Sequence, residues 1–124
     1  MTTATTTGLI TEVFKGRIDN GQTRTFDIVA LPGWRSSYVE VTALVQDVNS
    51  DTNRQFFHAE YGWFREWDKA PQHLLLSQVE KNTGIYKIDT IAEENVIKVR
   101  LVQNGFDTAT YFKIVVNYML VDVE

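Results

Sequence analysis

Alternation of apolar and polar side chains with a period of two residues is the feature that most constrains the fold of this chain. In Ser37–Val48, one side carries Val39, Val41, Ala43 and Val45, and the other carries Tyr38, Glu40, Thr42 and Leu44. In Val96–Gln103, Ile97, Val99 and Leu101 oppose Val96, Lys98, Arg100 and Val102. Successive side chains of a strand point to opposite faces, so this pattern predicts half-buried strands and disfavours helices.

Five further segments are rich in Val, Ile, Thr, Phe and Tyr, which favour strands: Leu9–Ile18, Thr23–Leu31, Gln55–Trp67, Ile85–Thr90 and Ala109–Val121. Turn-forming groups separate the strands: Asp19-Asn20-Gly21, Pro32-Gly33, Asn49-Ser50-Asp51, Asn82-Thr83-Gly84 and Asn104-Gly105. Seven or eight short strands at this spacing predict an all-β protein, an antiparallel β-sandwich or jelly roll.

The segment Pro71–Lys81 fits two interpretations. Pro71, Lys81 and Gly84 stand where a short helix would begin and end. The run Leu74–Leu76, followed by Val79, fits a buried strand equally well, because short apolar runs are ambiguous. We predict a strand here and keep a short helix over 71–81 as the alternative.

The chain of 124 residues is long enough for one domain with a real core, and its texture changes only at the N-terminus. Residues 1–7 contain no large apolar side chain after Met1 and are expected to form a flexible arm, so 8–124 is predicted to be a single β-sandwich domain. The chain contains no cysteine, which excludes disulfides, thiolate nucleophiles and cysteine-ligated metals.

A net charge of −4 disfavours nucleic acid as a partner, because binding to phosphates requires a dense cationic patch. The sequence contains neither an apolar run of the ~20 residues that a membrane span needs nor a signal-peptide pattern. We therefore expect no nucleic-acid partner, no membrane insertion and no secretory signal.

Catalytic motifs are missing from the sequence. Its two histidines, His58 and His73, do not lie in a nucleophile motif, and no phosphate-binding glycine string occurs. His58 and Glu60 lie on the same face of a strand, but a zinc site needs three or four ligands and spacing does not identify a third. We expect acids such as Glu93 and Glu94 to be solvated surface groups. The sequence therefore predicts a protein that is not an enzyme and has no metal or cofactor.

The segment Phe56–Trp67 contains six aromatic residues. On a strand, Phe57, Tyr61 and Trp63 would share one face and fill the core, unless a bulge at Gly62 resets the register. Alternatively, aromatic rings exposed near the strand end could bind a sugar with the help of polar neighbours. The candidate ligand-binding residues are Trp63, Phe64, Arg65, Trp67 and Asp68.

The last predicted strand is apolar on both faces. Phe112, Ile114, Val116, Tyr118 and Leu120 line one face, and Tyr111, Lys113, Val115, Asn117, Met119 and Val121 line the other. Either a second layer of the chain or another subunit must cover the second face, because monomers rarely expose large apolar patches. The candidate interface residues are Tyr111, Val115, Met119 and Val121.

The order of these segments resembles small β-sandwich domains of tailed-phage virion proteins. The resemblance spans about residues 8–124 and rests on Ser37–Asp47, His58–Trp63, Gly84–Ile88, Asn95–Leu101 and the closing apolar strand. Such domains occur at the distal ends of tail fibres and tailspikes and in some capsid decoration proteins. The similarity lies in the order of the segments and in their residue composition, without an invariant motif.

The resemblance implies a non-enzymatic, usually trimeric module of the virion, assembled in the host cytoplasm, that contacts other virion proteins or a host-surface glycan. Tip domains normally follow a long stalk, whereas only Met1–Thr7 precede the domain here. The chain is therefore expected to be an excised tip or a free-standing decoration, collar or adaptor subunit. The alternative function is a carbohydrate-binding module that uses the Tyr61–Trp67 aromatic cluster.

Overall fold

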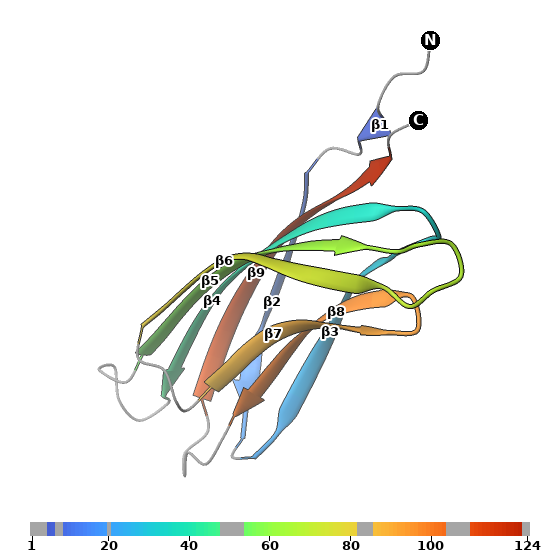
Figure 1. Cartoon of the computed structure of the whole chain (residues 1–124). Helices are drawn as coiled ribbons and strands as arrows, with labels where there is room; N and C mark the ends of the chain where they lie inside the picture. The colour runs from blue at the N-terminus through green and yellow to red at the C-terminus, as the bar shows by residue number, and fades with distance from the viewer. Residues whose placement is uncertain are drawn as a thin grey trace.

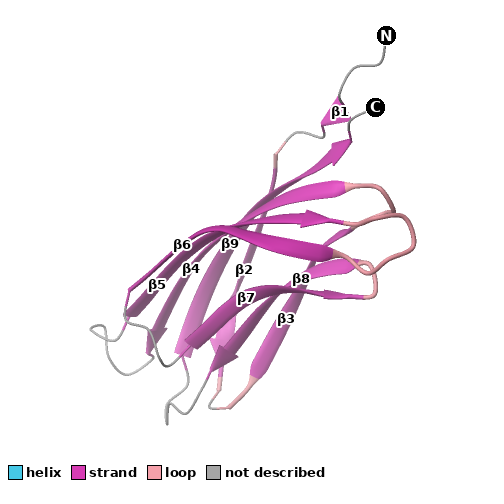
Figure 2. Ribbon diagram, in the orientation of Figure 1, coloured by secondary structure: helices cyan, strands magenta, loops and turns pink. Residues whose placement is uncertain are grey.

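All regular elements of the chain are β-strands in the computed structural model, which describes residues 5–6, 9–19, 21–47, 54–81, 86–103 and 110–122 (Figure 1, Figure 2). The strands are β1 (Thr5–Thr6), β2 (Ile10–Ile18), β3 (Thr23–Ala30), β4 (Ser36–Asp47), β5 (Arg54–Phe64), β6 (Gln72–Lys81), β7 (Tyr86–Glu93), β8 (Val96–Gln103) and β9 (Thr110–Asp122). The predicted all-β class is confirmed. No helix in these ranges could span a membrane.

The strands form two antiparallel sheets that face each other (Figure 1). The large sheet has the order β1-β9-β4-β5-β6, with β2 also paired to β9, and the small sheet has the order β3-β8-β7. Consecutive strands β4, β5 and β6 stay in the large sheet, whereas the chain crosses between sheets after β2, β3, β6 and β8. This arrangement is the predicted β-sandwich.

The core lies between the sheets and follows the alternation read from the sequence. Val39, Val41, Ala43 and Val45 of β4 are buried, as are Ile97, Val99 and Leu101 of β8. Residues paired across an antiparallel ladder share a face, so the inward side chains of neighbouring strands form continuous rows. The buried apolar residues of β9 are Phe112, Ile114, Val116 and Tyr118, the first four members of its predicted apolar face.

Residues 72–81 are a strand, so the strand prediction is confirmed and the alternative of a helix is wrong. β6 pairs with β5 from Phe64↔Gln72 to Phe56↔Lys81. The register shifts once, because Glu60 pairs with Ser77 and Tyr61 with Leu75, which leaves Leu76 as an extra residue in β6. The ladder between β5 and β4 is continuous through Gly62, so the bulge lies in β6 and not at Gly62.

The predicted turn after β2 is present. The amide of Gln22 donates to the carbonyl of Asp19 at 3.1 Å, and Gly21 adopts a φ of 76°. Glycine takes such a φ at no steric cost, which explains its place in this turn. The turns predicted at 49–51, 82–84 and 104–105 lie outside the described residues. Within the predicted arm 1–7, Thr5 and Thr6 pair with the end of β9.

Candidate functional site

The aromatic strand β5 presents its rings to both faces of the large sheet. Phe57, Ala59, Tyr61 and Trp63 are buried in the core, as the alternation predicts. Trp63 is only 3% exposed, and its Nε1 donates a hydrogen bond to Thr90 Oγ1 at 3.0 Å. The interpretation of Trp63 as a core residue therefore holds, and its proposed role in surface ligand binding is corrected. Phe64, at the end of β5, is 38% exposed on the outer face.

Trp67 is 64% exposed, in a loop and not in a strand. The strand ends at Phe64, before its predicted end at Trp67, because the chain turns there: the amide of Lys69 donates to the carbonyl of Glu66 at 2.8 Å. Asp68 is exposed in the same turn. Of the candidate ligand-binding residues, Phe64, Trp67 and Asp68 are therefore exposed.

Arg65 holds this loop in place. Its Nε donates to the carbonyl of Lys69 at 2.9 Å, and its Nη1 donates to the carbonyl of Leu31 at 3.2 Å. Leu31 is fully buried, so the guanidinium ties the loop to a rigid part of the core. Arg65 therefore acts as a brace between two loops, and these contacts use two of the five N–H donors of its guanidinium.

Trp34 is a functional candidate that the sequence analysis missed. It is 67% exposed, and its amide donates to the carbonyl of Arg65 at 2.8 Å. At the preceding Gly33, a Cβ atom would lie 2.4 Å from the carbonyl oxygen of Trp67. Two exposed tryptophans thus come from adjoining loops, although more than thirty residues separate them in the sequence. The local signal was a tryptophan directly after the predicted Pro32-Gly33 turn.

We call this region the tryptophan end: the loops Leu31–Arg35, Arg65–Pro71 and Glu94–Asn95 (Figure 2). The third loop is tied to the first by a hydrogen bond from the amide of Leu31 to the carbonyl of Asn95 at 2.7 Å. Trp34, Trp67 and Glu94 have φ values of 63°, 22° and 54°. Such backbone costs about 1–3 kcal/mol per residue and persists where the surroundings hold it, often at functional sites.

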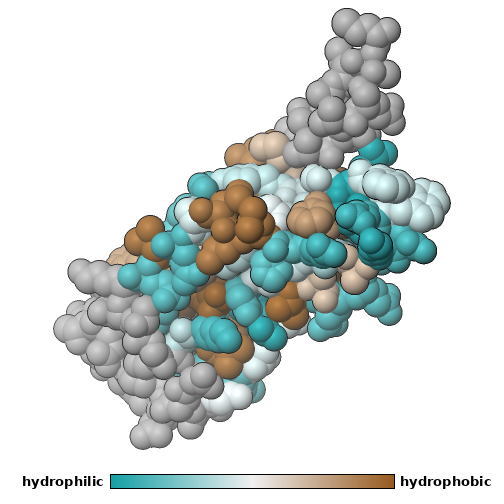
Figure 3. Space-filling view, viewed as in Figure 1, coloured by the Kyte–Doolittle hydropathy of each residue, from teal (hydrophilic) through white to brown (hydrophobic). Residues whose placement is uncertain are grey.

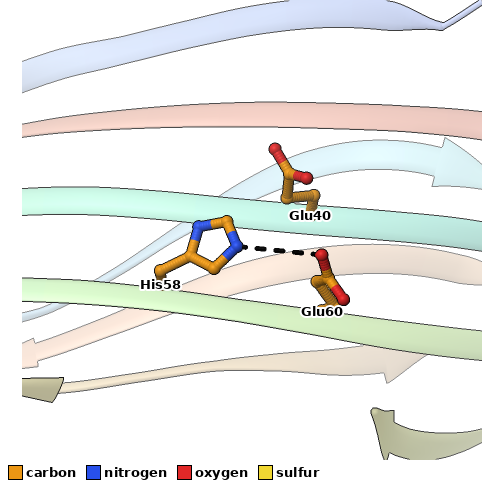
Figure 4. Close-up of side chains that lie close together, drawn as sticks. All are labelled: Glu40, His58 and Glu60. Atoms are coloured by element: carbon orange, nitrogen blue, oxygen red, sulfur yellow. Dashed lines mark ion pairs between the residues drawn. The ribbon is translucent and has the colours of Figure 1, made fainter. Parts of the chain in front are cut away.

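A second cluster of polar groups lies on the outer face of the large sheet: Glu40, His58 and Glu60 (Figure 4). Glu40 of β4 pairs directly with Glu60 of β5, and His58 Nε2 lies 3.9 Å from Glu60 Oε1. One ligand atom from each residue lies within 4.8 Å of the others, so the three could hold a cation. Glu40 is the third group that sequence spacing did not identify beside His58 and Glu60.

Hydrogen bonds from neighbouring strands also account for this cluster. Asn117 Nδ2 and the Tyr38 hydroxyl donate to the two oxygens of Glu40 at 3.0 and 3.2 Å. Ser77 Oγ donates to Glu60 Oε2 at 3.1 Å, and Thr42 Oγ1 lies 2.9 Å from His58 Nδ1. Burial, followed by hydrogen bonding and charge from the two glutamates, raises the pKa of Tyr38 well above its usual value. The carboxylates are therefore held by a polar network across four strands.

Three of the four predicted interface residues on β9, Tyr111, Val115 and Met119, point to the outer face of the large sheet. Tyr111 is 53% exposed, and Val115 and Met119 are half-buried; the side chain of Val121 lies outside the described residues. An open hollow of about 490 Å³ beside Tyr111 is lined by Leu44, Phe112 and the aliphatic stems of Lys15 and Lys113, among others. In the described part of the chain, no second layer covers this face.

The edge strand β6 exposes the largest run of apolar side chains. Leu74, Leu75, Leu76 and Val79 are 62, 46, 52 and 68% exposed. In the space-filling view, hydrophobic atoms gather on the front of the molecule near the middle of β6 (Figure 3). The sequence pattern predicts a buried strand for these residues. Their exposure is the largest difference between that prediction and the structure.

No protein-family model and no curated protein matches this sequence. Among solved structures, a tailspike protein, gp49 of the Acinetobacter baumannii bacteriophage Fri1, a capsular polysaccharide depolymerase, aligns with a TM-score of 0.44 and 12% identity. The alignment covers 89% of this chain and 17% of that protein. The tailspike of Acinetobacter baumannii phage AM24 aligns with a TM-score of 0.44 and 8% identity over 92% of this chain and 26% of that one.

Both structures are tailspikes of Acinetobacter baumannii phages. This chain spans 17% and 26% of their lengths, so it corresponds to a small part of each. A likeness at this level assigns neither a family nor an activity to this chain.

Proposed function

We propose that this chain is a non-enzymatic structural or host-recognition component of a phage virion and that it acts as a homo-oligomer. The observation that carries the proposal is the exposed apolar run of β6. Single exposed apolar residues are normal on a monomer, but four exposed apolar residues gathered on one edge strand mark an interaction surface. The resemblance of the sequence to phage virion domains supplies the context.

The outer face of the large sheet extends this surface, because Val13, Phe56 and Tyr111 are exposed on it beside β6 or across the sheet. Several weak contacts presented by a rigid oligomer reach high avidity without a deep pocket. The expected partners are copies of this chain, three by the resemblance, together with other virion proteins and a host-surface glycan. The expected location is the virion.

Size-exclusion chromatography with light scattering tests this proposal. At micromolar concentration, we expect a mass that is a multiple of the 14.2 kDa chain. A monomer at this concentration would contradict the proposal that the chain works as a homo-oligomer.

The alternative is a carbohydrate-binding module, and the specific observation that favours it is the pair Trp34 and Trp67 at the tryptophan end. Exposed, rigidly held aromatic rings beside polar groups are suited to stacking against sugars. Because Tyr61 and Trp63 of the Tyr61–Trp67 cluster are buried, the alternative relies on the exposed tryptophans of these two loops.

Titration of a glycan panel against tryptophan fluorescence tests the alternative. We expect glycan binding to change the tryptophan emission. Trp34→Ala and Trp67→Ala should each weaken the glycan affinity at least about tenfold, as for a dominant aromatic contact. Tyr111→Ala is the matched control, since Tyr111 is also an exposed ring but lies at the start of β9. Unchanged emission across the panel would reject the carbohydrate-binding alternative.

A further inference from the structure

The edge strand β6 carries exposed apolar side chains on an edge that no other strand of the described residues covers. It is the last strand of the large sheet and, among the described strands, pairs only with β5 (Figure 1). An open edge of this kind is a template for another strand, and natural proteins usually protect it with charges, prolines or a covering segment. Here the central residues Leu74, Leu75 and Leu76 are exposed instead. We infer that β6 pairs antiparallel with β6 of a second copy of this chain. This inference rests on the proposed homo-oligomeric function.

The bulge in β6 selects one register for this pairing. Paired residues on an antiparallel ladder must lie on the same face of the sheet. Ladder partners place His73, Leu75, Gln78 and Glu80 on the inner face, and Gln72, Leu74, Ser77 and Val79 on the outer face. Leu76, the extra residue, also faces outward, because its Cδ1 lies 4.0 Å from the Cβ position of Gly62.

A two-fold axis between Leu76 and Ser77 pairs each residue with one on its own face. Position 74 then lies opposite 79 of the second copy, 73 opposite 80, 75 opposite 78 and 76 opposite 77. Every shifted register that still aligns more than half of β6 places at least one outer residue opposite an inner one, because the bulge changes the alternation at the middle of the strand. The same register aligns β6 over its whole length.

The paired side chains are complementary in character. The exposed Leu74 of each copy lies opposite the exposed Val79 of the other copy, so this apolar pair occurs twice, once on each side of the axis. His73 lies opposite Glu80, so an imidazole N–H can donate to the carboxylate of the second copy. His73 is already oriented by its ring contact with Trp63, at 4.7 Å between centroids. The contact is isologous, and it joins the large sheets of two copies into one continuous sheet.

A charge-swap series on the full chain tests this register. Leu74→Lys and Val79→Glu should each convert the dimer to a monomer, because a charge enters the apolar pair at two symmetric places. The double variant L74K/V79E should restore the dimer, since each lysine then faces a glutamate of the other copy. The two positions are five residues apart, about 16 Å along a strand, so they cannot form this pair within one chain.

Leu9→Lys is the matched control, because Leu9 is also an exposed leucine but directly precedes β2, which pairs with β9 and not with β6, and it should leave the dimer unchanged. Light scattering gives the mass and circular dichroism verifies folding. If Leu74→Lys fails to fold, the L74C/V79C variant replaces it. The native chain has no cysteine, so oxidation of this variant should yield a covalent dimer on a non-reducing gel.

Failure of rescue in L74K/V79E together with failure of L74C/V79C to cross-link would overturn the inference. A native mass of three chains would also overturn it, because a two-fold contact between edge strands closes at two copies, while leaving the proposed homo-oligomeric function intact. A native monomer would contradict both.

Discussion

The tryptophan end is built around one residue with no room for a side chain. Gly33 lies against the backbone of Trp67, and the two loops that they belong to carry the exposed indoles. A side chain at position 33 would push on a carbonyl oxygen, which cannot rotate away like a flexible side chain. The spacing of the two tryptophans therefore depends on a glycine that precedes one of them.

We expect Gly33→Ala to destabilise the fold by about 1–3 kcal/mol, the usual cost of overpacking, because its Cβ would lie 2.4 Å from the Trp67 oxygen. Thermal unfolding would measure the loss, and near-ultraviolet circular dichroism would report a changed tryptophan environment. Gly21→Ala is the comparison: its φ of 76° carries a strain of about 1 kcal/mol, but nothing lies near its Cβ position. An unaltered tryptophan signal in Gly33→Ala would refute the close packing.

At the scale of elements, several buried hydrogen bonds join the two sheets inside the core, and one of them links two side chains of β5 and β7. Trp63 of β5 donates to Thr90 of β7, and both side chains are 3% exposed. Water cannot replace the acceptor at such a site, so its removal costs the full desolvation of the indole N–H. The bond also orients the indole between the two sheets, where its ring contacts the His73 ring of β6.

Thr90→Val keeps the shape of the side chain and removes the acceptor. The expected loss of unfolding free energy is about 1–3 kcal/mol, as for a buried donor left unpaired. Urea denaturation measures it, with Thr90→Ser as the control that retains the hydroxyl. Equal stability of Thr90→Val and the native chain would mean that the indole finds another acceptor.

At the scale of the whole molecule, tyrosines with raised pKa values make the unfolding free energy depend on pH in the alkaline range. Burial, aided by the charges of Asp89 and Glu80, raises the pKa of Tyr61 to about 12. Burial, together with nearby glutamates, also raises the pKa values of Tyr38 and Tyr118. The folded state therefore binds these phenolic protons more tightly than the unfolded chain does.

The stability contributed by Tyr61 is complete below pH ~10, the value of an unfolded tyrosine, and is lost as pH rises towards about 12. We expect the unfolding free energy of the native chain to fall over this window. In Tyr61→Phe, which has no phenolic proton there, the decline should be shallower. Denaturant titrations at a series of alkaline pH values measure both; parallel curves would exclude a contribution from Tyr61.

Much of the fold could be predicted from local patterns. The alternation in 37–48 and 96–103 identified the buried residues of β4 and β8, because the side-chain direction of a strand depends only on position along it. The aromatic face of β5 followed by the same rule. Its end at Phe64 did not, since the turn that follows depends on contacts of Arg65 with Leu31 and Lys69.

The sequence by itself determined that this chain forms strands and which face of most strands is apolar, because both are written in neighbouring residues. Tertiary structure alone decided which strands became neighbours. It brought Trp34 beside the loop of Trp67, and Glu40 beside His58 and Glu60. It also placed β6 at an edge, so that leucines with the pattern of a buried strand remained exposed. Strand order arises from packing between residues distant in sequence, and no local pattern records it.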